Sequence, residues 1–191
     1  MQDVRAVAPE KPWQTAVYLG MALFIISEAF LFGSLFWTYY YLRDNTPVWP
    51  PEGVDLNTVL VSVNTAVLLS SSLTMLWAAR AIRQGSREGL VAGLVATLLL
   101  GATFLSISVW EWSHQEFRPW DHAYGSIFYT LTGFHGAHVL GGLLILLVLL
   151  IRALRRRFSA QRYLAVEVGG LYWHFVDFIW IFVFSSIFVI R

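Results

Sequence analysis

The chain has 191 residues and a formal net charge of +1; 57% of its residues are hydrophobic, 13% are charged, and none is cysteine. Without cysteine it has no disulfide, no thiolate metal ligand and no cysteine nucleophile. A net charge this small gives no reason to expect nucleic-acid binding. A soluble domain of this length would expose too much apolar surface to stay dispersed, so we expect a membrane protein.

Five apolar stretches are long enough to cross a bilayer, which takes about 20 helical residues. The sequence therefore predicts an all-α membrane protein, a single transmembrane domain over residues 1–191 built as a bundle of five helices. The polar first dozen residues and the interruption of the first span by Glu28 are unlike a cleavable signal peptide. The expected spans are about 15–42, 56–79, 89–112, 123–151 and 165–190.

Positive charge is distributed unevenly between the two ends of this predicted bundle. One end holds the N-terminus and the second-to-third and fourth-to-fifth connections, with Arg5, Lys11, Arg80, Arg83, Arg87, Arg152, Arg155, Arg156, Arg157 and Arg162. The other end holds Arg43, Arg118 and Arg191. Positive residues favour the cytoplasmic side, so we expect a cytoplasmic N-terminus and a periplasmic C-terminus.

The basic residues after the fourth span have two interpretations. They could bind anionic lipid headgroups, or they could only fix the topology, and we weigh the two equally. These lipid-headgroup candidates are Arg152, Arg155, Arg156, Arg157 and Arg162.

Small residues at four-residue spacing indicate where helices contact each other, because they let backbones approach closely in lipid. The pattern is clearer on the fourth span than on the third. Its members are Gly133, Ala137 and Gly141 on the fourth span, and Gly93, Thr97 and Gly101 on the third.

Ionisable residues inside the spans are few, and such residues usually turn inward and find partners because hydrocarbon does not solvate charge. Two pairs stand three residues apart and so share a helix face. One interpretation is a metal or haem site between helices. The other, which we favour, is a structural network of hydrogen bonds, because a second histidine pair for haem ligation is missing. Besides Glu28, the set is His135, His138, Glu167, His174 and Asp177, and Glu111 and His114 lie near the outer end of the third span.

Glu28 lies near the middle of the first span with no basic residue close in sequence. Burial favours its neutral, protonated form. It could exchange protons or contact a lipid or a partner. The alternative is a neutral acid that hydrogen-bonds across the bundle, for instance to His135 or His138.

Motifs of known catalysis are missing from the sequence. It has no phosphate-binding glycine loop, no HExxH zinc site and no GxSxG nucleophile elbow. We therefore expect no catalytic residue and no metal site in this chain, which points to an accessory subunit.

Short motifs occur in a fixed order along the chain. They are Ile25–Glu28 with Phe36-Trp37, Trp49-Pro50-Pro51, Asn64-Thr65 before Leu69–Ser72, Glu111-Trp112, Tyr124-Gly125-Ser126, Thr132–Val139 and Tyr172–Trp180. In this order they resemble subunit III of the haem–copper respiratory oxidases over essentially the whole chain. Each motif alone is weak, but the ordered set is specific.

The resemblance implies an accessory, non-redox subunit of a proton-pumping cytochrome c oxidase, the enzyme that reduces oxygen to water. Haem and copper would lie in partner subunits. The partners would be the catalytic subunit I, subunit II and membrane phospholipids, in a bacterial cytoplasmic (inner) membrane. This chain would cross that membrane several times, stabilise subunit I, support proton uptake and bind phospholipid. Glu28 matches the family's buried glutamate, and the other five ionisable residues match its polar interior.

Many family members have seven spans, and this chain begins at what resembles their third, as in shorter bacterial forms. Half of the lipid cleft of the longer forms would then be missing. The alternatives are a quinol oxidase subunit III, a subunit-III-like protein of a nitric oxide reductase, a small transporter using Glu28 or Asp177, and a haem-bearing membrane anchor. That anchor would use His135, His138 or His174.

Overall fold

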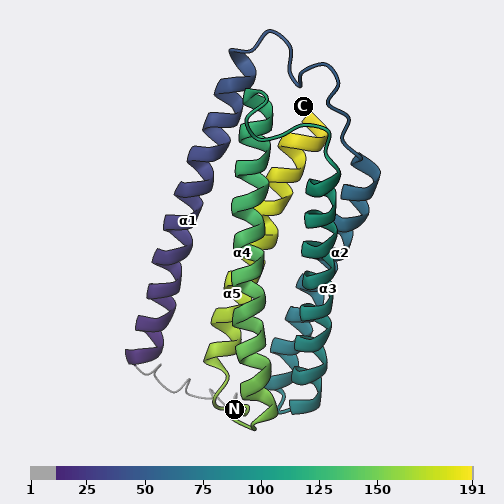
Figure 1. Cartoon of the computed structure of the whole chain (residues 1–191). Helices are drawn as coiled ribbons and strands as arrows, with labels where there is room; N and C mark the ends of the chain where they lie inside the picture. The colour runs from purple at the N-terminus through teal and green to yellow at the C-terminus, as the bar shows by residue number, and fades with distance from the viewer. Residues whose placement is uncertain (1–11, 191) are drawn as a thin grey trace, which may run out of the picture.

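The computed structural model describes residues 12–190, and over this range the chain forms five long helices and no β-strand (Figure 1). Each helix is long and apolar enough to cross a membrane. The all-α, five-helix fold is therefore confirmed, with helix ends shifted by a few residues from the predicted spans. The helices are α1 Pro12–Asp44, α2 Thr58–Arg83, α3 Arg87–His114, α4 Ala123–Leu154 and α5 Leu164–Phe184, which continues as the short π-helix η1 Ser185–Ile190.

Polar side chains define where three of the helices begin. A side chain just before each helix accepts a hydrogen bond from a backbone N–H in its first turn, which would otherwise have no partner. Gly85 has φ +82°, a left-handed conformation that suits glycine, and it turns the chain tightly from α2 into α3. The capping residues are Asn57 for α2, Ser86 for α3 and His122 for α4.

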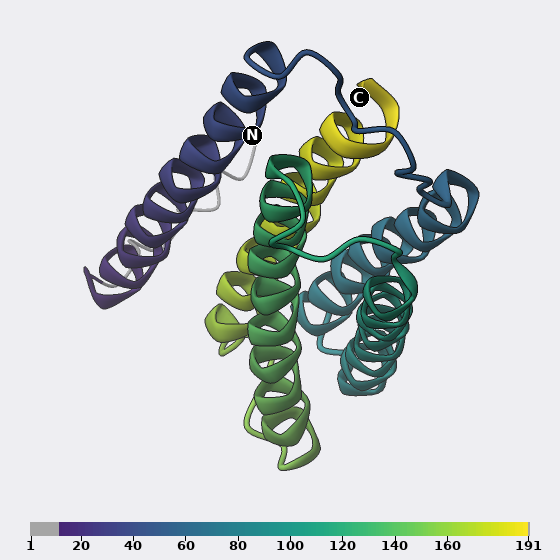
Figure 2. The ribbon, with the colours of Figure 1, turned by 45° about the horizontal axis from the view of Figure 1, so that its top comes forward.

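Helices α2 to α5 pack together, whereas α1 lies to one side and contacts α4 and α5 (Figure 2). In an apolar stretch of 18 residues of α1, only 6% of the residues are buried within the chain. The corresponding share for α5 is 50%. The interior of the fold is therefore formed mainly by α2 to α5, and most of the α1 surface is free to contact lipid or another protein.

Trp173 on α5 is the largest fully buried side chain, and two glycines make room for its ring. A Cβ placed on Gly101 of α3 would lie 2.6 Å from Trp173 Cη2. A Cβ placed on Gly142 of α4 would lie 2.7 Å from Trp173 Cε3. Gly93 packs equally closely on Ala78 of α2, so the small residues predicted on the third span do lie at helix contacts.

The prediction for the fourth span holds only for Gly141, whose Cβ position lies 3.5 Å from the Tyr172 hydroxyl on α5. Nothing lies within 4 Å of a Cβ placed on Gly133, and Ala137 is exposed. Gly136 is instead close to Trp112, and Gly142 is close to Trp173. The face of α4 that meets α3 and α5 is therefore rotated around the helix axis relative to the predicted stripe. The rings of Trp112 and Trp173 pack against α4 at Gly136 and Gly142, where a larger residue would not fit.

The chain crosses the bundle in alternating directions, so α1 begins at the opposite end from where η1 finishes (Figure 1). Arg87 donates hydrogen bonds to the carbonyls of Ala153 and Leu154, at 2.9 and 2.8 Å, so the second-to-third and fourth-to-fifth connections share one end. Arg5, Lys11 and Arg191, which were also counted in the charge asymmetry, lie outside the described residues. Which end faces the cytoplasm stays a prediction.

Candidate functional site

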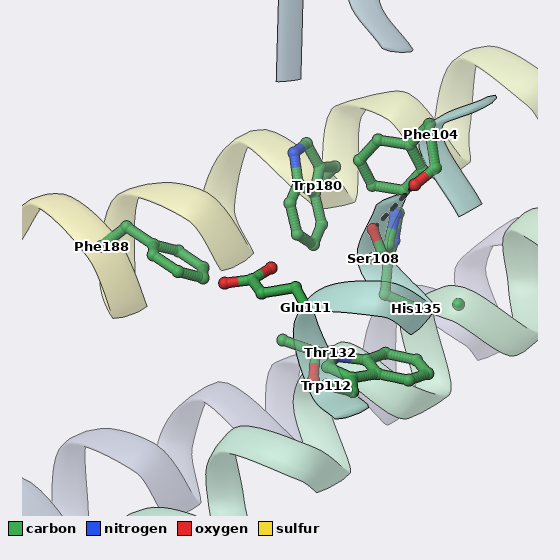
Figure 3. A pocket seen from close by; sticks show the side chains of 9 residues that line it. Phe104, Ser108, Glu111, Trp112, Thr132, His135, Trp180 and Phe188 are labelled. Atoms are coloured by element: carbon green, nitrogen blue, oxygen red, sulfur yellow. Dashed lines mark hydrogen bonds between the residues drawn. The ribbon is translucent and has the colours of Figure 1, made fainter. Parts of the chain in front are cut away.

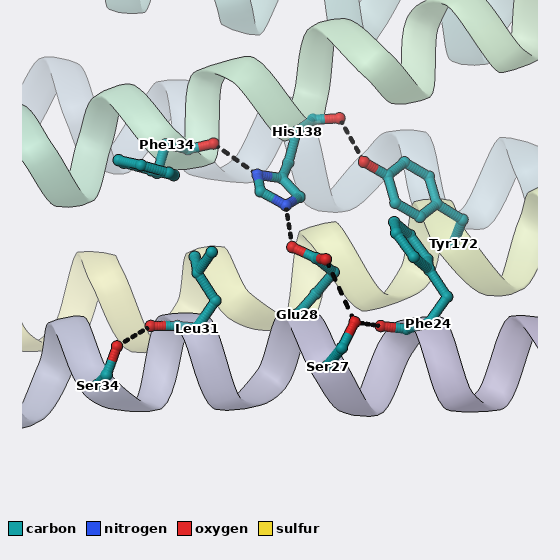
Figure 4. Close-up of polar contacts among 8 residues, drawn as sticks. All are labelled: Phe24, Ser27, Glu28, Leu31, Ser34, Phe134, His138 and Tyr172. Atoms are coloured by element: carbon teal, nitrogen blue, oxygen red, sulfur yellow. Dashed lines mark hydrogen bonds and ion pairs between the residues drawn. The ribbon is translucent and has the colours of Figure 1, made fainter.

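Glu28 and His138 form a polar contact between α1 and α4 (Figure 4). The distance from Glu28 Oε2 to His138 Nε2 is 3.0 Å, and the two side chains are 18% and 14% exposed. His138 Nδ1 lies 2.7 Å from the carbonyl oxygen of Phe134. The ring of Phe32 packs edge-on against the imidazole, with centroids 5.0 Å apart. Of the two histidines considered for Glu28, the fold brings His138 to it.

The partners of His138 define how many protons the pair holds. A carbonyl oxygen only accepts, so Nδ1 carries a hydrogen and donates to Phe134. Nε2 then either accepts a hydrogen bond from a neutral Glu28 or donates a hydrogen bond to the Glu28 carboxylate. In both cases one proton lies between Oε2 and Nε2, and the pair has no net charge. A neutral pair of this kind can remain inside a membrane without a further counter-ion.

His174 and Asp177 on α5 share a partner on α2. Ser72 Oγ donates a short hydrogen bond to the Asp177 carboxylate and lies 3.0 Å from His174 Nδ1. Because the single hydrogen of this hydroxyl is already donated, His174 Nδ1 donates to Ser72 Oγ. The three side chains form a hydrogen-bonded chain that joins α2 to α5.

Glu167 lies nearer the end of α5, beside a groove between α1, α2 and α5. Arg83 Nε on α2 donates to its carboxylate at 2.8 Å, and the Tyr18 hydroxyl on α1 donates to its other oxygen. The groove has a volume of about 220 Å³ and is also lined by His174. The side-chain partners of Glu167, His174 and Asp177 thus lie on α1 and α2, and none of these three residues bonds to a histidine of α4.

His135 is separate from both groups. Its side chain is 1% exposed, and neither ring nitrogen has a hydrogen-bond partner within residues 12–190. The ring lies between Trp180, at a centroid distance of 4.7 Å, and Phe104, at 5.9 Å (Figure 3). Although His135 and His138 are three residues apart, one faces the aromatic interior and the other faces α1.

The arginines proposed for lipid binding surround the turn that follows α4. Arg152 is in the last turn of α4, with its guanidinium 5.2 Å from the centroid of the Phe158 ring. Arg156 takes a left-handed conformation, with φ 56°, where the chain leaves the helix. The complete set, Arg152, Arg155, Arg156, Arg157 and Arg162, therefore gathers at one end of the bundle.

The ionisable residues thus form separate contacts between helices. Within the described part of the chain, no group of three or more His, Asp or Glu side chains is arranged to hold a metal ion. The predicted network is divided into a Glu28–His138 pair, a Ser72–His174–Asp177 chain, a Glu167–Arg83–Tyr18 contact and an isolated His135.

Sequence reasoning missed the partners on α2. Ser72 and Arg83 were named only as part of a serine-rich motif and of the charge asymmetry. A usable signal did exist, because a polar side chain inside an apolar span needs a hydrogen-bond partner. The polar positions of α2 bear this out: Thr65 accepts from Trp180 Nε1, and Ser71 accepts from Trp173 Nε1.

A model of the cytochrome c oxidase subunit III family matches residues 8–190. The chain belongs to the cytochrome c oxidase subunit III family. It is 41% identical to cytochrome c oxidase subunit 3 of Papio hamadryas over 184 residues, which cover 93% of this chain and 70% of that protein. The same protein of Tetraodon nigroviridis is 40% identical with the same coverage. That of Rattus norvegicus is 38% identical over 182 residues, covering 92% of this chain and 70% of the relative.

This membership confirms the resemblance and the accessory role in a respiratory oxidase that it implied. Subunit III is an accessory subunit of the respiratory oxidase, a proton-pumping oxidoreductase complex, and this chain is a multi-pass membrane protein. The comparisons do not favour a quinol oxidase, a nitric oxide reductase or a haem-bearing anchor. As a member of the family, the chain works together with other oxidase subunits.

Proposed function

We propose that this chain is a membrane-embedded support for the catalytic subunit I of a cytochrome c oxidase, with subunit II as a second partner. The observation that carries the proposal is the arrangement of α1, which is joined to α4 by the neutral Glu28–His138 pair while most of its surface remains exposed. Such a helix offers a long apolar surface to a neighbouring subunit or to lipid. Haem and copper belong to the partner subunits in this proposal.

The assembly is tested by isolating the complex through an affinity tag on this chain in a mild detergent. We expect the catalytic subunit and subunit II to co-purify, together with haem bands in a reduced-minus-oxidised spectrum. Recovery of this chain without a haem-containing oxidase subunit would contradict the proposal. A tagged, unrelated five-span membrane protein from the same cells serves as the control.

Support of proton uptake is the second part of the proposal, and Glu28 is the residue that we assign to it. Its carboxyl shares a proton with His138 and is 18% exposed, so it is not sealed inside the bundle. A carbodiimide, which attacks protonated carboxyls in apolar surroundings, should modify Glu28 in intact membranes. Glu28→Gln should abolish the labelling and slow proton uptake by the oxidase. Absence of labelling in the unaltered complex would argue against an accessible, protonated carboxyl.

Phospholipid binding is the third part. The arginines after α4 lie at one end of the bundle, where each could attract an anionic headgroup with about 1 kcal/mol. Replacing Arg155, Arg156 and Arg157 together by Gln should reduce the anionic lipid that co-purifies with the complex, as counted by mass spectrometry. Replacement of Arg118, in the loop at the other end, is the matched control. An unchanged lipid count would leave these arginines with a topological role alone.

We also propose a bacterial cytoplasmic membrane as the location of the complex. The support for this is the sequence resemblance to short bacterial forms of the subunit. Membrane fractionation of the source cells, with detection of this chain, tests it. Detection in an organelle membrane would contradict it.

A further inference from the structure

Two buried ionisable side chains line a small cavity between α3, α4 and α5 and take no part in the contacts described above (Figure 3). His135 has two ring nitrogens without partners in the described chain. Glu111 on α3 is 8% exposed, and its carboxylate has one long hydrogen bond, 3.4 Å from Gln115 Nε2. Burying such groups without partners is unfavourable, so something should satisfy them.

The size and chemistry of the cavity match a water molecule. Its volume is about 10 Å³, close to the minimum that holds one water. A neutral imidazole offers one donor and one acceptor, and water can serve both imidazole and carboxyl. Ser108 and Thr132 also line the cavity, and each donates its own hydrogen to a backbone carbonyl, at 3.0 and 2.7 Å. The Thr132 oxygen therefore remains available as an acceptor for water, and Ser108, which already accepts from Asn64 at 3.3 Å, keeps one free lone pair.

The remaining walls allow no counter-ion for a charge placed there. They are aromatic or lack a polar side chain: Phe104, Trp112, Gly136, Trp180 and Phe188. Among the ionisable groups on the same helices, His138 on α4 bonds to α1 and Asp177 on α5 bonds to α2. Tyr129 on α4 lies near Glu111, and its hydroxyl is directed to the backbone carbonyls of Trp112 and Phe117, each at 3.2 Å. From the α2 side Asn64, which is uncharged, donates to Ser108.

We infer that this cavity binds a water molecule that joins Glu111 to His135, and that the three together store and exchange one proton. When the proton moves, the O–H bond of the Glu111 carboxyl breaks and water accepts that proton. The water gives one of its own protons to a ring nitrogen of His135, forming an N–H bond. Water is regenerated, and the site keeps one proton throughout. Glu111 lies in the last turns of α3, close to the connection that follows.

The test uses the intact oxidase complex and infrared spectroscopy of carboxyl groups, in H₂O and in D₂O. We expect a protonated carboxyl band that disappears in Glu111→Gln and shifts in His135→Gln. Glu116→Gln, which changes an exposed glutamate in the adjacent loop, should leave the band unchanged. A Glu111 band that is identical in His135→Gln, or no band that Glu111→Gln removes, would overturn the proton-sharing pair.

A second measurement needs no substitution, in case a variant fails to assemble. A high-resolution density map of the unaltered complex should show a water within about 2.7–3.2 Å of both a Glu111 oxygen and a His135 nitrogen. A map with no water in the cavity, or with a water that contacts only one of the two side chains, would overturn the inference.

Discussion

At the scale of single residues, Glu28 decides how α1 is held. Replacing it by Leu leaves His138 Nε2 without a partner, which should lower the free energy of unfolding by about 1–3 kcal/mol. Glu28→Gln should lower it less, because the amide can donate to Nε2 while Nδ1 still donates to Phe134. Reversible unfolding in mixed micelles measures both. Ser34→Ala, which removes an exposed hydroxyl bonded within α1, is the control and should have little effect.

If Glu28→Leu and Glu28→Gln lower the free energy of unfolding equally, the Glu28–His138 contact does not stabilise the fold through its hydrogen bond. The comparison separates that bond from packing, since Leu and Gln are similar in size.

Ser72 should matter more than its size suggests, because one hydroxyl serves two buried ionisable groups. Ser72→Ala leaves His174 Nδ1 and an Asp177 oxygen without their partner, and we expect a loss of about 1–3 kcal/mol. The measurement is again the free energy of unfolding in mixed micelles. Ser70→Ala is the matched control, since its hydroxyl is exposed and bonds only to the Ala66 carbonyl of the same helix. Similar effects of the two changes would refute a joining role for Ser72.

At the scale of elements, Trp173 packs closely against Gly101 and Gly142. Gly101→Ala would place a Cβ 2.6 Å from Trp173 Cη2, so the ring or the helix must move. We expect a loss of about 1–3 kcal/mol, as for other overpacked interiors. Gly133→Ala should be tolerated, because nothing lies within 4 Å of its Cβ position. The thermal stability of the purified complex measures the effect of both substitutions. A large loss of stability in Gly133→Ala would show that Gly133 does lie at a helix contact.

The helices also differ in how they are held. α1 lies at one side of the fold and buries few of its residues, whereas α5 is half buried. α5 also makes polar contacts with α1, α2 and α4. At the far end of the bundle, the Tyr39 hydroxyl of α1 donates at 2.7 Å to the carbonyl of Ser186 in η1. In a π-helix the backbone hydrogen bonds join residues five apart, so its carbonyl groups are oriented differently from those of an α-helix. The Tyr39 hydroxyl donates to one of these carbonyls, that of Ser186.

At the scale of the whole molecule, orientation in the membrane is the main open prediction. The natural chain contains no cysteine, so a single introduced cysteine reports on its own position. Glu52→Cys, in the first connection, should react with a membrane-impermeant maleimide added to intact cells. Gln161→Cys, in the connection before α5, should react only after the membrane is opened. The reverse pattern would contradict the cytoplasmic placement of the arginine-rich end.

The whole molecule also shows how far the sequence could lead. Length, hydropathy and the ordered motifs were sufficient for five helices and for the family, because each depends on local composition along one helix. The ionisable residues in the spans stood out for the same reason. Their partners could not be recognised in the sequence. Ser72 meets Asp177, and Arg83 and Tyr18 meet Glu167, only when helices that are distant in sequence pack together.

By itself, then, the sequence determined the membrane-spanning class, the approximate helix ends and which side chains hydrocarbon would not tolerate. Tertiary structure alone decided that Glu28 meets His138, that His135 faces a small cavity with Glu111, and that Gly136 and Gly142 make the close contacts of α4. The physical reason is rotation about the helix axis. Residues three or four apart share a face, but only packing against large side chains such as Trp173 determines which neighbour that face meets.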